Sequence, residues 1–416
     1  MKALGGAGMK ILNFGSCNID YVYSLDHIVN AGETQTTYKL ETFPGGKGLN
    51  QSIALSKAGA GVYHAGCVGI DGKMLTDIMA ENGVDISYMH TADAKNGHAV
   101  IQVSKAGENS IFLYSGSNDM ISKEYVDFVL EKFTAGDFIL LQNEINNIDY
   151  IIEKAHKKGM NIVFNPSPFN EKIKEIDFNV LSYIILNEVE GKCISGYDDT
   201  EMILQYFKNK YPNLKVMLTL GKNGCVYQDK VCEIFHPAFE VKAIDTTAAG
   251  DTFTGYFVAG VAKKQDIQEV LKIASAASAM AVSKKGAAPS IPNRDEVLNE
   301  ISKLKVKKAD NKTNDLREKI EEYIEQNLQN ANLEELSKKM GYSSVYMGSL
   351  VKTMTGETFS SLLRNKRCDA AAQMLLNTDL SVREIISRVG YNNESFFRKK
   401  FSEKYGTNPV AFRKNR

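Results

Sequence analysis

Hydrophobic and polar positions follow two different patterns in the first 300 of the 416 residues. A short apolar run at 10–15 predicts a core strand. Period-two stretches predict four further early strands, at 21–24, 35–42, 99–105 and 110–114. From about residue 120, helix-like segments alternate with buried strands, at 138–142, 161–165, 183–187 and 216–220. The alternation predicts an α/β fold whose parallel sheet is covered by helices, and the four early strands predict a separate small sheet.

The pattern changes again near residue 300. The lysine-rich segment 301–314 has no aromatic residue and is predicted to be a linker. Beyond it no strand pattern remains, and glycines punctuate short helices, which predicts an all-α domain over 315–416. Within that domain, 333–352 and 381–400 form a weak repeat: a helix, then Gly-Tyr, then a helix with a polar start. The first domain is accordingly assigned to 9–300.

Charge distinguishes the two ends of the chain. Lys+Arg and Asp+Glu each total 50, so the formal net charge is zero. Residues 1–300 carry 28 basic and 36 acidic side chains, whereas 336–416 carry 15 basic and 6 acidic ones. A basic terminal domain favours nucleic-acid binding at that end, although a solvated helical surface gives the same count.

The remaining composition excludes several classes of protein. The six cysteines are scattered without a CxxC pair, so neither a zinc site nor a disulfide framework is expected, and a reducing cytoplasm fits best. No apolar run approaches the roughly 18–20 residues of a membrane span, so no membrane contact is predicted. Residues 1–8 lack the apolar core of a signal peptide, and the true start is either Met1 or Met9.

Two segments carry candidate chemistry. The first, 245–253 (DTTAAGDTF), precedes a helix-like run; small residues and a helix starting near Gly250 make a phosphate site, and Asp251 can take a proton from an attacking hydroxyl. An Asp N-cap explains the same pattern. The second, 43–50 (FPGGKGLN), can close over a small polar ligand, with Lys47 and Asn50 as donors. It lacks the GxxxxGK[ST] of a Walker A loop, and a structural glycine turn is the alternative.

Together with other landmarks in the same order, these segments resemble the ribokinases of the phosphofructokinase-B sugar kinase family over 9–300. The matching stretches are GSCNID (15–20), GET (32–34), GGKGLN (45–50), NPSP (165–168), NEVE (187–190), TLGKNG (219–224), DTTAAGDTF (245–253) and KKGAAPSIP (284–292). The resemblance implies a ribokinase-like α/β fold with a small β lid over the sugar. Such lids pair two subunits, so a homodimer is expected, and lid closure would exclude water.

The resemblance also implies roles for individual residues. Asp251 would be the catalytic base, and the backbone N–H groups of Ala248, Ala249 and Gly250 would form an anion hole. The sugar pocket would comprise Asn18, Asp20, Gly46, Lys47, Asn50, Glu144 and Asp251. The nucleotide site would be lined by Asn187, Thr219, Gly221, Gly224, Gly250 and Ser275.

ATP, Mg²⁺ and K⁺ are the cofactors that the resemblance implies. Glu190, of the NxxE motif, would organise Mg²⁺ through water. The K⁺ ligands, mostly backbone carbonyls, would come from Asp245, Thr247, Ala281, Lys284, Gly286 and Ser290. The GGKGxN form of the pocket motif favours a pentose such as ribose. Leu49 and Tyr256 each stand where the family has a smaller residue, so related sugars and nucleosides stay open.

The last hundred residues have helix-turn-helix spacing in both repeats, which a helical bundle or protein-docking module would also show. Segment 385–416, with GTNP at 406–409, resembles the second helix-turn-helix of AraC-type regulators. The resemblance covers about 317–416 and implies recognition helices near 344–354 and 393–405 that bind double-stranded DNA. The base-edge candidates are Ser344, Tyr346, Ser349, Asn393, Glu394, Ser395 and Arg398. The phosphate candidates are Lys352, Arg364, Lys366, Arg367, Lys399 and Lys400. Phe396, Phe397 and Phe401 are predicted to be mostly core.

The sequence therefore predicts an ATP-dependent kinase converting D-ribose to D-ribose 5-phosphate, fused to a transcriptional regulator domain. One alternative is a sugar-sensing transcription factor without turnover, and another is a kinase for a different sugar or a nucleoside. The presence of Asp251, the small-residue loop and the cation ligands favours an active kinase.

Overall fold

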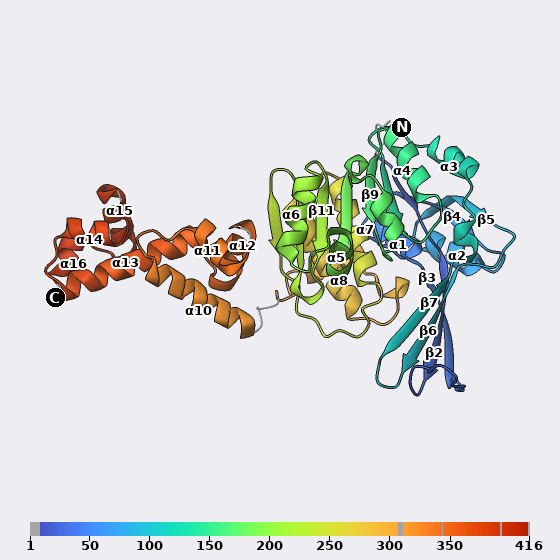
Figure 1. Cartoon of the computed structure of the whole chain (residues 1–416), viewed down its shortest axis with the longest axis horizontal. Helices are drawn as coiled ribbons and strands as arrows, with labels where there is room; N and C mark the ends of the chain where they lie inside the picture. Colours follow the sequence, from blue (N-terminus) through green and yellow to red (C-terminus); the bar gives the residue numbers. More distant parts are fainter. Residues whose placement is uncertain (1–8, 307–310, 343, 392, 415–416) are drawn as a thin grey trace. The chain divides into compact units, whose positions relative to one another are not determined.

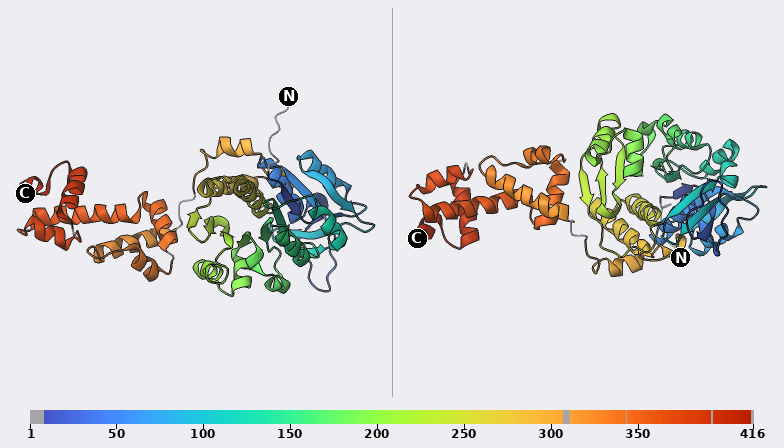
Figure 2. Two further views of the ribbon diagram at one scale, coloured as in Figure 1. Left: turned by 90° about the horizontal axis from the view of Figure 1, so that it is seen from above. Right: turned by 60° about the horizontal axis from the view of Figure 1, so that its bottom comes forward.

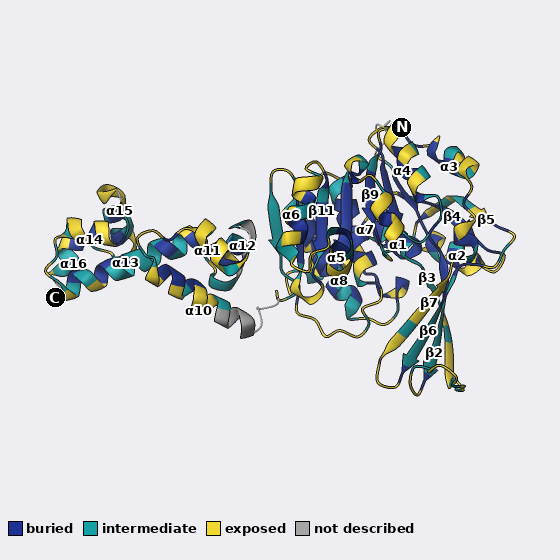
Figure 3. Ribbon diagram, viewed as in Figure 1, coloured by how far each residue is buried: buried dark blue, intermediate teal, exposed yellow. Residues whose placement is uncertain are grey.

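The computed structural model describes residues 9–306, 311–342, 344–391 and 393–414, and the chain forms two compact units, one made mostly of 9–306 and the other mostly of the residues from 311 on (Figure 1). Each unit has its own hydrophobic interior, shown by the buried residues in Figure 3. Among the described helices, none combines the length and the apolar character needed to cross a membrane.

A nine-stranded sheet forms the centre of the first unit, in the order β13-β12-β11-β10-β9-β8-β1-β4-β5. Its strands are β1 Ile11–Phe14, β4 Val62–Val68, β5 Asp85–Thr91, β8 Phe138–Gln142, β9 Asn161–Asn165, β10 Tyr183–Asn187, β11 Lys215–Thr219, β12 Cys225–Gln228 and β13 Glu233–His236. Neighbours from β11 to β5 run parallel, which confirms the predicted α/β class, but β12 is antiparallel to β11. The sequence pattern did not predict β4, β5, β12 or β13; β4 includes His64 and Gly66, and β5 is largely polar.

Helices cover both faces of this sheet (Figure 2). Helices α1, α7 and α8 pack against one another on one face, and α3 to α6 lie on the other. The bounds are α1 Lys47–Lys57, α2 Lys73–Glu81, α3 Lys123–Leu130, α4 Ile148–Lys157, α5 Glu188–Ser195, α6 Thr200–Lys210, α7 Ala249–Ala262, α8 Ile267–Val282 and α9 Arg294–Glu300. Short 3₁₀ helices are η1 Gly116–Asp119, η2 Glu171–Glu175, η3 Phe178–Val180, η4 Gly221–Asn223 and η5 Ala288–Ser290. Strand order reverses at β1, between β8 and β4, and ligands of open α/β sheets bind beyond the strand ends at such a point.

The predicted separate sheet is present as β3-β2-β6-β7. Its strands are β2 Asn18–Leu25, β3 Lys39–Gly45, β6 His98–Ser104 and β7 Asn109–Tyr114. Strand β3 starts four residues later than predicted and continues into the glycine segment that opens α1. At the edge strand β7, four consecutive apolar side chains at 111–114 are each 50% or more exposed. This smaller sheet, referred to below as the lid, therefore exposes an apolar edge.

Helix α7 packs tightly on α1, which accounts for Gly255 and Tyr256. A Cβ at Gly255 would lie 2.3 Å from the Cβ of Ala54 on α1, so only glycine permits this approach. Tyr256 is buried, and its hydroxyl donates to the carbonyl of Pro292 at 2.7 Å. The tyrosine therefore joins α7 to the segment before α9 and does not shape the sugar pocket.

From residue 311 on, the described part of the chain forms helices and no strand, as predicted. Its helices are α10 Asn311–Gln326, α11 Leu333–Met340, α12 Ser344–Thr355, α13 Phe359–Asn377, α14 Val382–Arg388, α15 Glu394–Tyr405 and α16 Pro409–Arg413. One core packs α10, α11, α12 and the first part of α13, and another packs the rest of α13 with α14 and α15. Gly341 and Gly390, with φ of 73° and 86°, form the two turns before the second helix of each repeat. Both helix-turn-helix units are thus present, joined by α13.

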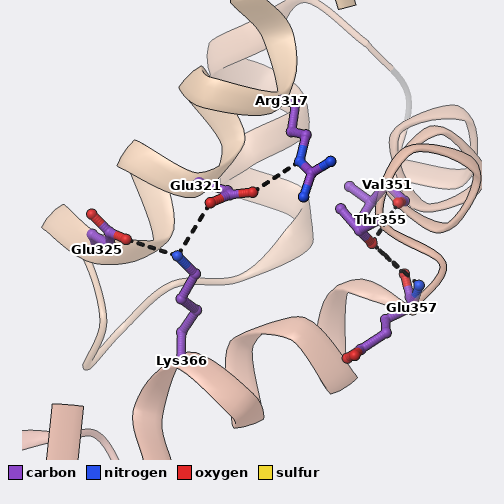
Figure 4. Close-up of polar contacts among 7 residues, drawn as sticks. All are labelled: Arg317, Glu321, Glu325, Val351, Thr355, Glu357 and Lys366. Carbon is purple, nitrogen blue, oxygen red and sulfur yellow. Dashed lines mark hydrogen bonds and ion pairs between the residues drawn. The ribbon is translucent and has the colours of Figure 1, made fainter. Parts of the chain in front are cut away.

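Polar contacts hold α10 against α13 (Figure 4). Lys366 Nζ lies 3.2 Å from a Glu321 oxygen and 2.8 Å from a Glu325 oxygen, and Arg317 Nε donates to Glu321 at 3.0 Å. On the neighbouring turn, the Thr355 hydroxyl lies 2.8 Å from the Val351 carbonyl oxygen. Lys366, predicted to meet phosphate, is therefore paired within the protein.

Candidate active site and nucleic-acid interface

The start of α1 brings the glycine segment against the chain that follows β1. Gly46 caps the helix at a φ of 92°, and a Cβ at Gly48 would lie 2.4 Å from the backbone nitrogen of Ser16. The Lys47 backbone N–H donates to Glu144 Oε2 at 3.0 Å, and the Ser16 hydroxyl donates to the same oxygen. Glycine is required here because the segments meet at backbone contact.

Asp251 lies buried in the first turn of α7. Ala248 occupies the N-cap position, so the interpretation of Asp251 as an N-cap is wrong. Asn50 Nδ2 donates to Asp251 Oδ2 at 3.0 Å, and Gln51 Nε2 donates to Oδ1 at 2.9 Å. Burial raises the pKa of Asp251, while Lys47 and the two amides act in the opposite direction. A buried carboxylate with a raised pKa is suited to accept a proton.

Charged groups from several elements surround this carboxylate. Burial raises the pKa of Asp20 to about 7, with further contributions from Glu144 and Asp251. Burial likewise raises the pKa of Glu144. For Lys47, burial opposes the charge, but Asp251, Glu144 and Glu190 outweigh it and raise the pKa. Carboxylates and amides converging around one ammonium group suit a neutral ligand with several hydroxyls.

Two cavities contain predicted site residues. One, of about 120 Å³, is lined by Lys47, Asn187, Glu190, Thr219, Thr247, Gly250 and Asp251 with five others. It brings together residues assigned to the sugar, the nucleotide and both metals. The other, of about 740 Å³, is lined by Asn18 and Glu144 with Leu113 and Tyr114 of the lid. Asn50 Oδ1 is buried without a hydrogen-bond partner among the described residues, which leaves an acceptor for a ligand hydroxyl.

The NxxE motif forms a capping box at the start of α5. Asn187 Oδ1 accepts from the Glu190 N–H at 2.9 Å, and Glu190 Oε2 accepts from the Asn187 N–H at 2.9 Å. Glu190 is buried and lines the smaller cavity, so its other oxygen can reach a cation through water. The fixed carboxylate fits the Mg²⁺ assignment.

Three residues assigned to the nucleotide line neither cavity. Gly221 and Gly224 lie between β11 and β12, and a Cβ at Gly224 would lie 2.1 Å from the carbonyl oxygen of His236. Ser275 is buried on α8, 3.8 Å from the Cys225 sulfur. Gly224 and Ser275 are thus closely packed near the β11–β12 turn, whereas Gly221 is exposed and a Cβ there would meet nothing within 4 Å.

The residues assigned to K⁺ come from two segments that Asp245 joins. Its Oδ1 accepts from the Thr247 N–H at 3.0 Å, and its Oδ2 accepts from the Gly286 N–H at 3.0 Å. Burial alone would raise the pKa of Asp245, but these bonds outweigh it and lower that pKa. The Ala281 carbonyl accepts from the Lys284 N–H, and the Ser290 hydroxyl donates to the Ala287 carbonyl. Among the described residues, no group of three or more His, Cys, Asp or Glu side chains could hold a metal ion.

Sequence reasoning missed several polar residues of the site. Gln51 contacts the Asp251 carboxylate and also donates to Asn165 Oδ1 at 3.1 Å, while Asn118 Nδ2 donates to Asn18 Oδ1 at 2.7 Å. The run Asn50-Gln51-Ser52 in an otherwise apolar helix was the available signal, because three consecutive polar residues cannot all face solvent.

The second helix of each repeat carries the DNA candidates. The Asn393 side chain caps α15 by accepting from the Phe396 N–H at 2.9 Å. Arg398 NH2 pairs with Glu394 at 2.7 Å, and Ser395 is exposed. Ser344 is half-buried at the start of α12, while the side chains of Tyr346 and Ser349 lie outside the described part of the chain. The exposed face of α15 thus offers amide, hydroxyl and guanidinium groups.

One predicted core residue and one further phosphate candidate are placed differently. Phe397 and Phe401 are fully buried, but Phe396 is 45% exposed, with Arg364 and Lys400 near its ring, so its core assignment is wrong. Arg367 donates to the backbone carbonyls of Leu328 and Gln329, which ties α13 to the segment after α10. Lys352 and Lys399 are exposed and remain phosphate candidates.

Both units match known families. Residues 9–294 match the model of the pfkB family carbohydrate kinases, and 336–415 match that of a helix-turn-helix domain. A ribokinase of Haemophilus influenzae is 35% identical over 294 residues, covering 68% of this chain and 95% of that protein. A ribokinase of Bacillus subtilis is 34% identical over 293 residues, covering 69% and 98%. The crystal structure of a ribokinase from Thermotoga maritima is 32% identical with a TM-score of 0.64, covering 71% of this chain and 99% of that one.

Proposed function

Because this chain belongs to the pfkB family of carbohydrate kinases, we propose that its first unit transfers the γ-phosphoryl group of ATP to the 5-hydroxyl of D-ribose. The products are D-ribose 5-phosphate and ADP. The observation that carries the proposal is the buried Asp251 carboxylate, which shares one cavity with Lys47 and the start of α7. The ribokinase names of the relatives support ribose as the acceptor.

The chemical step uses residues of this chain in distinct roles. Asp251 takes the proton of the sugar hydroxyl as its oxygen forms a bond to the γ-phosphorus, and the bond from that phosphorus to the β–γ bridging oxygen breaks. The backbone N–H groups of Ala248, Ala249 and Gly250, at the N-terminus of α7, stabilise the charge on the transferred group. Lys47 balances the negative charges that meet there.

The sugar is held by the polar groups around α1 and β2. Asn18, Asp20, Asn50 and Glu144 offer donors and acceptors to its hydroxyls. The nucleotide would lie beside Asn187 and Thr219. Mg²⁺, held through water by Glu190, would neutralise phosphate charge, and K⁺ near Asp245 would order the loop before α7.

The first test is ATP consumption by the purified full chain against pentoses, hexoses and nucleosides, with and without K⁺. We expect turnover with ribose that K⁺ stimulates. Turnover with another acceptor would replace ribose and keep the chemistry. Sugar binding without any turnover would favour the alternative of a sensor that lacks catalysis.

The second unit is an AraC-type helix-turn-helix domain, and we propose that it binds double-stranded DNA through α12 and α15. ATP and DNA are both available in the cytoplasm, where we place the protein. Because the two functions share one chain, sugar or nucleotide occupancy is proposed to change DNA affinity. Equal affinity with ribose, ATP, ADP or no ligand would contradict this coupling.

Arg398→Ala is expected to weaken operator binding by roughly 5- to 100-fold, the cost of about 1–3 kcal/mol for one base-directed contact. Phosphorylation should not change, because within the described part of the chain Arg398 forms its hydrogen bonds and ion pair with Glu394 on its own helix. Fluorescence anisotropy with operator DNA, selected beforehand from a random pool, measures the affinity. Lys338→Ala is the matched control, since Lys338 forms a similar exposed pair with Glu334 on α11.

A homodimer through the lid is the third part of the proposal. The exposed side chains Ile111 to Tyr114 on the edge strand β7, with Leu40 on β3, support it. Burying them would stabilise a pair of lids. A monomeric mass in sedimentation equilibrium at micromolar concentration would contradict the dimer.

A further inference from the structure

A continuous chain of buried hydrogen bonds leads from Asp251 into the interior of the first unit. Gln51 Nε2 donates to Asp251 Oδ1 at 2.9 Å, and Gln51 Oε1 accepts from Gln142 Nε2 at 2.8 Å. Gln142 Nε2 also donates to Asn13 Oδ1 at 2.9 Å. Gln51, Gln142 and Asn13 are all fully buried. They come from α1, β8 and β1, so the chain links the helix to the centre of the sheet.

The far end of this chain fixes the direction of every bond in it. Asn13 Nδ2 donates to Ser52 Oγ at 2.8 Å, and Ser52 Oγ lies 2.7 Å from His64 Nδ1. Burial lowers the pKa of His64 to about 4, so at neutral pH the ring is uncharged. Its Nε2 lies 3.2 Å from the Gly15 carbonyl oxygen and 3.5 Å from Cys17 Sγ, and a proton on Nε2 satisfies the carbonyl and leaves Nδ1 to accept from Ser52. The Asn13 orientation is fixed independently, because its Nδ2 also donates to the Gly48 carbonyl oxygen at 2.7 Å. Each amide then has one orientation that satisfies its neighbours.

This direction determines what Gln51 presents to Asp251. A flipped Gln51 amide would place Oε1 against the carboxylate and Nε2 against Gln142 Nε2, which are two repulsive contacts. The amide N–H is therefore held toward Asp251 Oδ1, while Asn50 holds Oδ2. With one bond on each oxygen, the remaining lone pairs of Asp251 are available to the cavity that Lys47 and Gly250 line.

We propose that Gln51 is a positioning residue for phosphoryl transfer: its amide, locked by Gln142 and Asn13, fixes the Asp251 carboxylate in the orientation that receives the hydroxyl proton. The inference rests on the proposed function, since it gives Asp251 the role of base. The charged groups facing Asp251 are Lys47 from α1, Asp20 from β2, Glu144 after β8 and Glu190 from α5.

The test compares Gln51→Met, which keeps the length of the side chain and removes the donor, with Gln51→Glu, which adds a second carboxylate. For Gln51→Met we expect kcat to fall about 10- to 100-fold, with the KM for the sugar within about twofold. The acid limb of the kcat profile should move to higher pH, because the lost bond stabilised the charged form, and it should move further in Gln51→Glu.

Two further variants separate positioning from folding. Gln142→Met removes the bond that orients Gln51 together with the bond to Asn13 Oδ1, but it leaves the bond from Gln51 to Asp251 in place, so it should give a smaller fall in kcat in the same direction. Tyr256 lies on the same helix as Asp251, and Tyr256→Phe loses the hydrogen bond to the Pro292 carbonyl, so this variant should leave kcat and its pH profile unchanged. Equal melting curves for the variants would show that each is folded.

A ¹³C NMR titration of the Asp251 carboxyl, with the signal assigned from Asp251→Asn, measures the effect of the Gln51 hydrogen bond on this carboxyl without requiring turnover. An upward shift of this titration in Gln51→Met is expected. A parent chain that phosphorylates no acceptor would overturn the proposed function and with it the role in transfer. A parent that is active, with Gln51→Met matching it in kcat and in both pH profiles, would overturn the positioning role alone.

Discussion

Asp251→Asn is expected to lower kcat by roughly 10²- to 10⁴-fold, the range for loss of a general base. Asparagine has nearly the same shape but cannot take the hydroxyl proton. Its amide also meets two donors, Asn50 Nδ2 and Gln51 Nε2, so one of those hydrogen bonds must be lost. Sugar binding, measured by isothermal titration calorimetry, should change little.

Asp20→Asn is the matched comparison for this variant. Asp20 lies in the same charged cluster on β2 but is assigned to sugar hydroxyls, so its loss should raise the KM for the sugar more than it lowers kcat. Near-parental turnover by Asp251→Asn would remove Asp251 as the base.

Phe397→Ala is expected to destabilise the second unit by about 3–5 kcal/mol. Phe397 is fully buried in the core that α13, α14 and α15 share, and its ring contacts those of Tyr391 and Phe401. A loss of this size is a large part of the roughly 5–15 kcal/mol that stabilises a domain. DNA binding should therefore be lost at temperatures where kinase turnover persists. Calorimetric melting of the full chain, with both activities followed, measures the effect.

The neighbouring Phe396→Ala serves as the control for stability. Phe396 is 45% exposed, so its removal should change the melting of the second unit by less than about 1 kcal/mol. If Phe397→Ala melted like Phe396→Ala, the second core would not depend on that side chain.

The pattern of hydrophobic and polar residues predicted strands and helices well where all residues of an element are buried alike. Strands such as 138–142 and 183–187 are apolar throughout and were located to the residue, because both faces of the sheet are covered. Strand β4 was missed because His64 lies inside it, buried against Ser52 and Gly15 rather than exposed. The sequence alone does not show which polar residues are paired inside the protein.

The candidate site shows the same limit. Asp251 and the start of α7 could be predicted, since small residues before a helix have a direct physical meaning. The polar run at 50–52 signals a buried polar cluster, but the pairing of Gln51 with Gln142 and Asp251 could not be predicted, because these partners lie 91 and 200 residues away along the chain. The pairing of Lys366 with Glu325 and the exposure of Phe396 were not predicted for a related reason. Without knowing which residues face them, we assigned the lysine to phosphate and the phenylalanine to the core.

Helix α13 has a consequence for the sites that the protein can read. It has 19 residues, about 28 Å at 1.5 Å per residue, and it belongs to both hydrophobic cores of the second unit. It sets the spacing between α12 and α15, the two helices proposed to contact DNA, because both cores pack on this one helix. Successive major grooves on one side of B-DNA are 34–36 Å apart, so a fixed distance between α12 and α15 fits one spacing of the two contacted grooves. Inserting half a turn of DNA between the two segments that the helices contact would move one segment to the opposite side of the duplex, where its helix could not reach it.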